Sequence, residues 1–322
     1  MAPIIEIINL SKAYGRSAAR RLAVDRLDLS VEEGDIFGFV GPNGAGKTST
    51  IRIMATLLQA TSGDIRVAGH SVSKNPRGVR KAIGYMPDFF GVYNDMTVWE
   101  YLDFFGACYK IPPATRAALI DDLLELVDLT HRRDDMVDGL SRGMKQRLSL
   151  ARTLVHDPQV LILDEPASGL DPRARIEIRT LMVELAQMGK TIFFSTHILA
   201  DVAEICTRVG IIEAGRLVAS GPLEELQQHL VPHRRIQITV LDQVEKARDL
   251  LQATPGVLTV ETPPGQINGG HQRLEFEFAG DDPTLSALLS KLVEESIPVV
   301  HFSGDSRDME EVFMRATKGL VT

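Results

Sequence analysis

Residues 41–49 read GPNGAGKTS, which fits the phosphate-loop pattern G-x-x-x-x-G-K-[ST] and is the strongest indication of the fold. It follows an apolar run, DIFGFV (35–40), that is typical of a strand, and it opens a predicted helix over residues 46–58. At average residue frequencies the pattern arises by chance about once per hundred chains of this length. Between a strand and a helix, it predicts a phosphate-binding site.

The glycines of this loop, Gly41, Gly44 and Gly46, let the backbone curl so that successive N–H groups face a phosphate. The helix N-terminus adds a partial positive charge. Lys47 is predicted to bridge the β- and γ-phosphates, and the Thr48 hydroxyl to bind Mg²⁺. We expect nucleotide contacts along the whole loop: Gly41, Pro42, Asn43, Gly44, Ala45, Gly46, Lys47, Thr48 and Ser49.

A second apolar run, VLILDE (160–165), ends in two carboxylates. Open parallel sheets bind their ligands beyond the carboxyl ends of the strands, so both acids are expected beside the phosphate loop. Asp164 is predicted to hold Mg²⁺ through water, and Glu165 to orient or deprotonate the attacking water. Such a pair alone is more often a polar strand end, but beside a phosphate loop it predicts hydrolysis.

Strand-like and helical runs alternate along the first two thirds of the chain. Residues 97–156 are predicted to be mostly helical, with one helix at 117–127, and another helix begins at Pro172. Strands are predicted at 4–10, 22–31, 35–40, 160–163, 191–195, 208–213 and 216–220. Apolar strands between helices predict an α/β fold whose mainly parallel sheet is covered on both faces.

A domain boundary is predicted at VPHRR (231–235), beyond which the pattern restarts. The order strand, helix, strand, strand, helix, strand is typical of a small α+β domain of the ferredoxin-like kind. We therefore expect two domains, 1–231 and 232–322. The turn-rich stretch PPGQINGGH (263–271) is a predicted loop of the second domain. This domain carries no catalytic constellation that we can identify.

Composition excludes several classes of protein. The 322 residues carry a formal net charge of −8, which lacks the basic footprint of a general nucleic-acid binder. Two cysteines, Cys108 and Cys206, cannot build a disulfide framework and favour a reducing compartment. No stretch reaches the roughly 18 apolar residues of a membrane helix. We expect a cytoplasmic protein without a nucleic-acid partner, whose role at a membrane depends on other subunits.

Ordered motifs make residues 4–228 resemble the ATP-binding subunit of an ABC transporter. They are SKAYG (11–15), the Walker A loop GPNGAGKTS (41–49), the signature LSRGMKQRLSLAR (140–152), Walker B VLILDEP (160–166), the D-loop SGLD (168–171) and STH (195–197). The resemblance implies a P-loop NTPase core with a mainly parallel sheet, an antiparallel β subdomain and a helical subdomain near residues 89–156. ATP and Mg²⁺ are the implied cofactors.

The resemblance also implies roles for single residues. Tyr14 stacks on adenine, and His197 contacts the γ-phosphate, so that Lys47, Glu165 and His197 form the implied catalytic set. Residues of the signature and the D-loop face ATP held by a second subunit: Ser141, Arg142, Gly143 and Asp171. The metal ligands implied are Thr48, Asp88 and Asp164.

Two departures from the family pattern stand out. Asp88, in GYMPDFFGVY (84–93), occupies the place of the usual glutamine; it is expected to contact the nucleotide–metal site, where a carboxylate could bind Mg²⁺ directly. In the signature, Arg142 replaces a glycine and Met144 a glutamine. Arg142 either adds a charge-assisted phosphate contact or points to solvent while the helix N-terminus binds the anion, and the sequence leaves both open.

These departures, and the ending DMEEVFMRATKG (308–319), resemble an exporter-type branch that handles drugs, sodium, lipids or polysaccharides. The branch implies Mg²⁺-dependent ATP hydrolysis that powers export through separate membrane-spanning permease subunits. A second ATP-binding subunit, most simply another copy of this chain, would close head to tail upon it at the cytoplasmic face of the cell membrane. The aromatic stretch 89–109 is the candidate contact for the permease.

Two alternatives remain from the sequence. One is a soluble ABC-type ATPase acting in translation or DNA repair. The compact 117-residue interval between Lys47 and Asp164, the single ATP-binding region and the acidic charge disfavour it. The other is a module that binds ATP without hydrolysing it. The complete set of catalytic residues disfavours that reading, although Asp88 leaves room for it.

Overall fold

The computed structural model describes residues 3–15, 21–89, 91, 95–230, 233–263, 271–304 and 309–317. The chain divides into two compact units. The first contains the described residues up to Leu223 together with Thr317, and the second runs from Glu224 to Ala316. The division falls at the start of helix α8 (Leu223–Leu230), earlier than the boundary predicted after residue 231.

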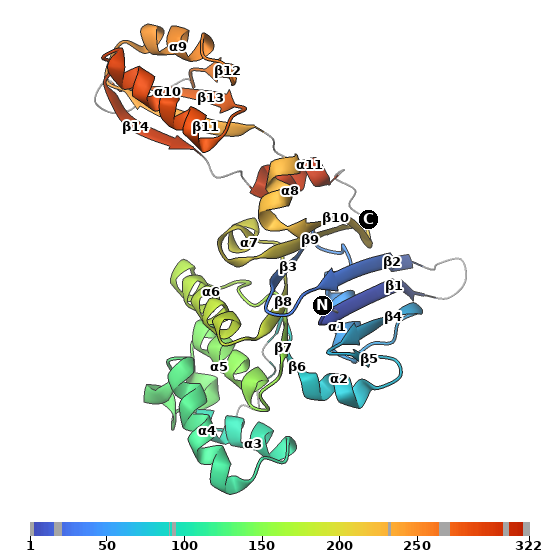
Figure 1. Ribbon diagram of the computed structural model, residues 1–322. Coiled ribbons are helices and arrows are strands. Elements are labelled where there is room, and N and C mark those ends of the chain that lie inside the picture. The colour runs from blue at the N-terminus through green and yellow to red at the C-terminus, as the bar shows by residue number, and fades with distance from the viewer. Residues whose placement is uncertain are drawn as a thin grey trace. The chain divides into compact units, whose positions relative to one another are not determined.

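A six-stranded sheet forms the centre of the first unit, in the order β10-β9-β3-β8-β7-β6 (Figure 1). Neighbouring strands are parallel except at β10, which pairs antiparallel with β9. The strands are β3 (Ile36–Val40), β6 (Ile83–Met86), β7 (Val160–Asp164), β8 (Thr191–Thr196), β9 (Arg208–Glu213) and β10 (Arg216–Pro222). The mainly parallel sheet predicted from the sequence is thereby confirmed.

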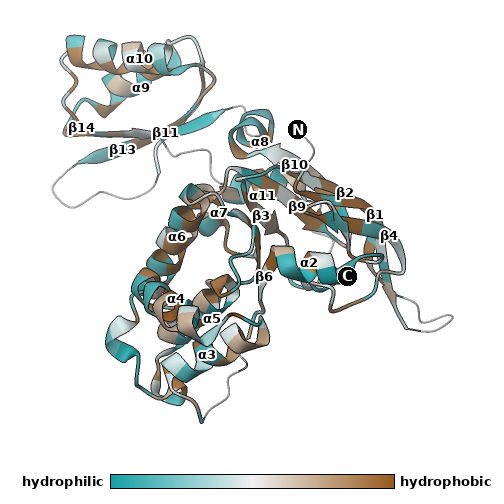
Figure 2. Cartoon of the chain, turned by 60° about the horizontal axis from the view of Figure 1, so that its bottom comes forward, coloured by the Kyte–Doolittle hydropathy of each residue, from teal (hydrophilic) through white to brown (hydrophobic). Residues whose placement is uncertain are grey.

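Alternate side chains of the buried strands enter two different cores. In β7, Leu161 and Leu163 pack into a core with helices α5 (Arg142–Leu154) and α6 (Pro172–Gln187), whereas Val160 and Ile162 face the opposite core. This arrangement explains the uninterrupted apolar sequence of β7, because both faces of a covered parallel strand must be apolar. Figure 2 shows hydrophobic colour on strands of the first unit and also on the helices α5 and α6.

The opposite core lies beneath a second, antiparallel sheet. Its strands, in the order β2-β1-β4-β5, are β2 (Arg21–Val31), β1 (Ile5–Tyr14), β4 (Ser62–Val67) and β5 (His70–Ser71). Ile5, Val24 and Ile65 from this sheet pack with Ile51 of α1 (Lys47–Met54) and Phe39 of β3. Helix α2 (Pro76–Ala82) follows β5. The antiparallel subdomain is therefore joined to the phosphate loop through a shared core.

The helical subdomain is built from α3 (Val98–Cys108), α4 (Pro113–Leu126) and α5, with two short 3₁₀ turns at Thr130–Arg132 and Val137–Gly139. Helix α3 begins at a capping box in which Thr97 and Glu100 satisfy each other's backbone N–H groups. Buried side chains of all three helices share one core with α6. Helix α7 (Leu199–Ile205) follows β8. The prediction of a mostly helical region over 97–156 is confirmed.

The second unit contains a four-stranded antiparallel sheet in the order β12-β13-β11-β14. Its elements are α8, β11 (Arg234–Val240), α9 (Val244–Gln252), β12 (Val257–Glu261), β13 (Gln272–Phe278), α10 (Asp282–Glu294), β14 (Val299–Gly304) and α11 (Met309–Ala316). Ile236, Phe276 and Leu288 belong to its core beneath α9 and α10 (Figure 1). This βαββαβ order confirms the predicted ferredoxin-like arrangement; the predicted loop 263–271 lies mostly outside the described residues.

Candidate nucleotide-binding site

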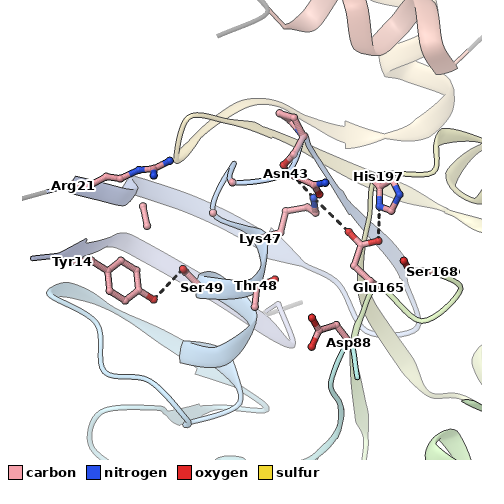
Figure 3. Close-up of a pocket in the computed structure, with 14 residues that line it drawn as sticks. Tyr14, Arg21, Asn43, Lys47, Thr48, Ser49, Asp88, Glu165, Ser168 and His197 are labelled. Carbon is pink, nitrogen blue, oxygen red and sulfur yellow. Dashed lines mark hydrogen bonds and ion pairs between the residues drawn. The ribbon is translucent and has the colours of Figure 1, made fainter. Parts of the chain in front are cut away.

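The predicted site residues come from the carboxyl ends of three adjacent parallel strands. The phosphate loop follows β3, Asp164 and Glu165 end β7, and His197 follows β8. Because β3, β8 and β7 are neighbours in the sheet, these segments meet at one edge. A cavity of about 610 Å³ opens there (Figure 3) and is lined by Tyr14, Arg21, Ala23, Pro42, Asn43, Gly44, Gly46, Lys47, Thr48, Ser49, Asp88, Glu165, Ser168 and His197.

Lys47 occupies the inside of the phosphate loop. Its Nζ donates to the carbonyl oxygens of Gly41, at 2.6 Å, and Pro42, at 3.2 Å, and it lies 3.5 Å from Glu165 Oε1. The residue is buried, and burial lowers the pKa of its ammonium while the Glu165 carboxylate opposes that shift. The loop therefore holds a buried cation at the bottom of the cavity, where an anionic ligand can reach it.

Two glycines let the loop sit directly against the rest of the site. A Cβ on Gly41 would lie 2.3 Å from the Ile212 carbonyl oxygen. A Cβ on Gly46, whose φ is +110°, would lie 2.3 Å from the Ala23 carbonyl oxygen of β2. Only glycine fits such contacts, and only glycine adopts this φ without strain. The glycine spacing read from the sequence thus has a packing reason in addition to a phosphate-binding one.

Asp164 lies below the cavity rather than on its wall. Its Oδ1 accepts from the Ser195 hydroxyl at 2.6 Å and from the Thr48 hydroxyl at 3.4 Å. The buried Oδ2 has no hydrogen-bond partner among the residues that the structure describes. Burial raises the pKa of the Asp164 carboxyl, although the bond from Ser195 opposes the shift. An oxygen left without a donor in this position fits a role toward a cation.

Oxygen ligands of the kind that Mg²⁺ prefers surround this point: the Thr48 hydroxyl, the Asp164 carboxylate and the Asp88 carboxylate on the cavity wall. Within the described ranges, no group of three or more His, Cys, Asp or Glu side chains forms a ready-made metal site. This is compatible with Mg²⁺, because proteins usually hold that ion with one or two carboxylates together with phosphate oxygens and water.

Glu165 is held from three directions. Its φ is +52°, a left-handed conformation, and its N–H donates to the carbonyl and hydroxyl oxygens of Ser195 at 3.2 and 3.1 Å. Its Oε2 lies 2.7 Å from Nδ1 of His197, and its Oε1 faces Lys47. Figure 3 shows the carboxylate between these two side chains. The geometry fixes an acid at the cavity wall with a histidine on its open side.

Tyr14 closes the other end of the cavity. Its hydroxyl lies 3.2 Å from Ser49 Oγ, and Lys12 Nζ lies 5.1 Å from its ring centroid. The exposed fraction of Tyr14 is 43%, so a planar group can reach the ring. In the β1–β2 pair Tyr14 stands directly opposite Arg21. The structure therefore places the predicted stacking residue on the cavity, beside an arginine that sequence reasoning missed.

Six predicted nucleotide contacts do not line this cavity: Gly41 and Ala45 of the phosphate loop, and four residues of the signature and the D-loop. Ser141 caps α5 by accepting from the Met144 N–H at 3.3 Å, and Asp171 caps α6 through the Ala174 N–H at 3.0 Å. Gly143 lies so close to Ala174 that an added Cβ would come within 2.9 Å of its Cβ. Arg142 donates to the Ser168 carbonyl oxygen of its own chain. The predicted roles of these last four residues toward ATP on a second subunit remain predictions.

Two further residues of the site were not anticipated. Ser168 lines the cavity from the D-loop, and Ser195 joins Asp164 to the backbone of Glu165. A signal for Ser195 was present in the sequence, since it directly follows the apolar centre of β8, Ile192–Phe194; the structure pairs it in register with Asp164.

Comparison with known proteins agrees with this geometry. The ABC transporter family profile matches residues 24–168. Over 316 residues the chain is 33% identical to a Nod factor export ATP-binding protein I of Ralstonia nicotianae, covering 98% of this chain and 94% of the relative. Over 240 residues it is 40% identical to the bacitracin transport ATP-binding protein BcrA of Bacillus licheniformis, covering 74% and 76%. A solved ATP-binding subunit of an ABC transporter matches with a TM-score of 0.62 and 29% identity over 70% of this chain and 92% of that one.

A phosphate loop, a buried strand ending in two acids and a following histidine define a P-loop ATPase. The chain belongs to the ABC transporter family as an ATP-binding subunit, and proteins of this class are ATPases. Across the parts of the chain that the structure describes, no helix has the length and apolarity needed to span a membrane.

Proposed function

We propose that this chain hydrolyses Mg²⁺-ATP to power export through separate membrane-spanning permease subunits. The observation that carries the proposal is the position of Glu165, whose two carboxylate oxygens face Lys47 and His197 at the end of a buried strand beside the phosphate loop. The name of one relative, a Nod factor export protein, supports export as the direction, and that of another, a bacitracin transport protein, supports a transport role.

The proposed binding mode follows the length of the cavity. Adenine stacks on Tyr14, the loop N–H groups bind the phosphates, and Lys47 exchanges its loop carbonyl partners for β- and γ-phosphate oxygens. Mg²⁺, when bound, neutralises the developing negative charge on the phosphates. Thr48, Asp164 and Asp88 are the residues that would hold it.

The proposed chemistry rests on Glu165 and His197. Glu165 accepts a hydrogen bond from the attacking water and takes its proton as the oxygen adds to the γ-phosphorus, while the bond from that phosphorus to the β–γ bridging oxygen breaks and ADP leaves with its electron pair. His197 keeps the carboxylate in place through its Nδ1, and its ring, which lines the cavity, is the proposed γ-phosphate contact. Because the Glu165 backbone is fixed by Ser195, the carboxylate needs little rearrangement to act.

Assembly completes the proposal. A second copy of this chain would pack head to tail, so that the N-terminus of its α5, with Ser141, Gly143 and the nearby Asp171, closes the open side of the ATP site. ATP then favours the closed dimer, and hydrolysis removes the γ-phosphate contacts that hold it, which is a ligand-driven population shift.

The permease contact is proposed near the start of the helical subdomain, at the cytoplasmic face of the membrane. Exposed aromatic side chains lie there on both sides of the buried Tyr101: Phe89 is 68% exposed, Phe104 37% and Tyr109 44%. Two other aromatic residues of this predicted contact, Phe90 and Tyr93, lie outside the described residues. Large exposed apolar groups of this kind mark interaction surfaces.

Trapping the closed state tests the function and its partner together. A Glu165→Gln chain would be loaded with MgATP, and membranes would be extracted in mild detergent to identify the proteins that accompany it. We expect a multi-span membrane protein. Recovery of ribosomes, nucleic acid or soluble proteins alone would contradict the transport role. The matched control is Glu165→Gln combined with Lys47→Ala, which removes the proposed phosphate contact and should recover no partner in an ATP-dependent manner.

A further inference from the structure

The guanidinium of Arg142 contacts the loop that follows Glu165 in its own chain. Its Nη2 donates to the Ser168 carbonyl oxygen at 3.0 Å. A Cβ on Gly169 would lie 2.5 Å from the Arg142 guanidinium carbon, so the group packs against a position that carries no side chain. Gly169 has a φ of +67°, which turns the loop so that this approach is possible. The contact is thus both a hydrogen bond and a close packing of planar guanidinium on backbone.

A second side chain of the same helix holds the same loop. Gln146, one helical turn beyond Arg142, donates from Nε2 to the Pro166 carbonyl oxygen at 2.6 Å in a buried position. Residues 165–171 are also braced internally, because the Ser168 N–H donates to the Glu165 carbonyl oxygen at 3.1 Å. Two side chains of α5 therefore donate hydrogen bonds to two carbonyl oxygens of one seven-residue segment. This segment starts at Glu165 and ends at Asp171, the N-cap of α6.

The position of Arg142 on its helix makes this contact informative. Arg142 is the first residue of α5, where the unpaired N–H groups already place positive charge and where a cation is disfavoured. An arginine here needs an acceptor, and the acceptor that the structure supplies is in its own chain. Arg142 is an exposed residue, yet its guanidinium is bonded to its own chain, which neither expectation drawn from the sequence included; the phosphate contact with a second subunit stays a prediction.

We propose that Arg142 is a positioning residue that acts within its own chain: it fixes the D-loop, and through that loop the backbone of Glu165 and the cavity-lining Ser168. It thereby links the helix that would cover a second subunit's ATP to the hydrolytic acid of this chain's own site. The kinetic part of this proposal rests on the proposed ATPase function, whereas its structural part does not.

Hydrogen exchange of the full-length, nucleotide-free chain tests the structural part. In Arg142→Ala, the amides of Ser168 and Leu170 should exchange about tenfold faster, while amides of β13 in the second unit keep their rates. Arg173→Ala is the matched control, since Arg173 is an exposed arginine of the adjacent helix that pairs only with Glu177 in the interactions described. Unchanged exchange of both loop amides in Arg142→Ala would overturn the proposal.

Steady-state hydrolysis tests the functional part. Arg142→Ala should lower kcat three- to tenfold without changing the Kd for ATP, and Gly169→Ala, which displaces the guanidinium, should lower kcat similarly. The double variant should be no slower than the worse single variant, because both remove one interaction. Fully multiplicative losses would contradict a contact within the chain.

A conservative replacement separates positioning from phosphate binding. Arg142→Lys keeps the charge but lacks the planar group that packs on Gly169, so it should recover less than half of the lost kcat. Full recovery with lysine would favour a simple charge contact with a partner's phosphate and would overturn the proposal. If the unmodified chain hydrolyses no ATP, the proposed function fails, and the exchange measurement alone still decides the role of Arg142.

Discussion

His197 Nδ1 and Glu165 Oε2 lie 2.7 Å apart, although 32 residues separate them in the sequence. The opposite oxygen of the same carboxylate lies 3.5 Å from Lys47 Nζ. In the nucleotide-free chain the acid is therefore held between two nitrogen groups that are both expected to contact a γ-phosphate. We expect a bound phosphate to attract Lys47 and leave Oε1 free to face the attacking water, so that nucleotide binding itself would prepare the proposed base.

Replacing Glu165 by glutamine should abolish hydrolysis while leaving ATP binding intact. The amide can still lie between Lys47 and His197, but it cannot accept the proton from water, and loss of a general base costs about 100-fold or more. Phosphate release and equilibrium ATP binding would be measured on the same preparation. Glu224→Gln, on the exposed side of α8, serves as the control. A variant that keeps more than a tenth of the rate would show that another group takes the proton.

Replacing Asp164 by asparagine should stabilise the chain when nucleotide and metal are absent, at the expense of activity. Burial raises the pKa of the native carboxyl above its ordinary value of 3.8, so the native state binds more protons than the unfolded state between these two pKa values. The free energy of unfolding therefore falls as pH rises from the pKa of this carboxyl in the unfolded chain to its pKa in the native chain. Asparagine keeps an acceptor for Ser195 without the charge.

The gain in stability of Asp164→Asn over the parent chain should accordingly be largest at pH values above the raised native pKa of Asp164. It should shrink as pH falls toward the ordinary value of 3.8. We expect a gain on the order of 1 kcal/mol near neutral pH, measured by thermal unfolding in EDTA at several pH values. The same comparison with saturating MgATP should reverse the order, because the carboxylate then has a cation beside it. A variant less stable than the parent at neutral pH in EDTA would refute the cost assigned to the buried charge.

Arg21→Ala should weaken ATP binding about tenfold, or about 1.4 kcal/mol, and leave adenosine binding unchanged. Arg21 lines the cavity, and one of its terminal nitrogens would lie 3.9 Å from a Cβ on Gly44 of the phosphate loop. Tyr14→Ala should weaken both ligands, since stacking needs only the base. Equal losses for ATP and adenosine in Arg21→Ala would place the arginine at the base instead of the phosphates. Arg66→Ala, which changes an exposed side chain of β4, is the control.

Asp88→Gln should keep the ATPase rate within about tenfold of the parent, or 1.4 kcal/mol. Asp88 lies on the cavity wall, and its charge adds to the cost of ionising Asp164. Removing that charge should also have only a modest effect on the Mg²⁺ concentration at which hydrolysis reaches half of its maximal rate. Complete loss of activity would show that this carboxylate has a role that the usual glutamine of the family cannot fill.

Local sequence was sufficient for the phosphate loop and the two acids, because each role depends on residues adjacent in the chain. A strand, a glycine turn and a helix follow one another at 36–54, and VLILDE places its acids at a strand end without reference to other segments. The alternation of strands and helices likewise predicted the strands of the single sheet in the second unit and the mainly parallel sheet of the first.

Contacts between distant segments could not be read in this way. Arg21 follows another arginine in the sequence, a pattern that is typical of a solvent-exposed surface. It reaches the cavity only because the β1–β2 pairing places it opposite Tyr14. The target of Arg142 depends on a loop 26 residues away and on the absence of a side chain at Gly169. Asp164 lies beside Thr48 of the phosphate loop as expected, but its complete burial, which keeps it off the cavity wall, could not be read from the sequence.

The close backbone contact between Gly46 and Ala23 fixes the distance between the two ends of the cavity. Ala23 belongs to β2, the strand that also begins with Arg21, and the Gly215 amide donates to Ala45 while its carbonyl accepts from Asp25. The base end and the phosphate end are thus joined by main chain, so exchanging a side chain does not alter the span between them. We therefore expect the cavity to select ligands by their length. Selection among ligands of the same length would then depend on the side chains at its two ends.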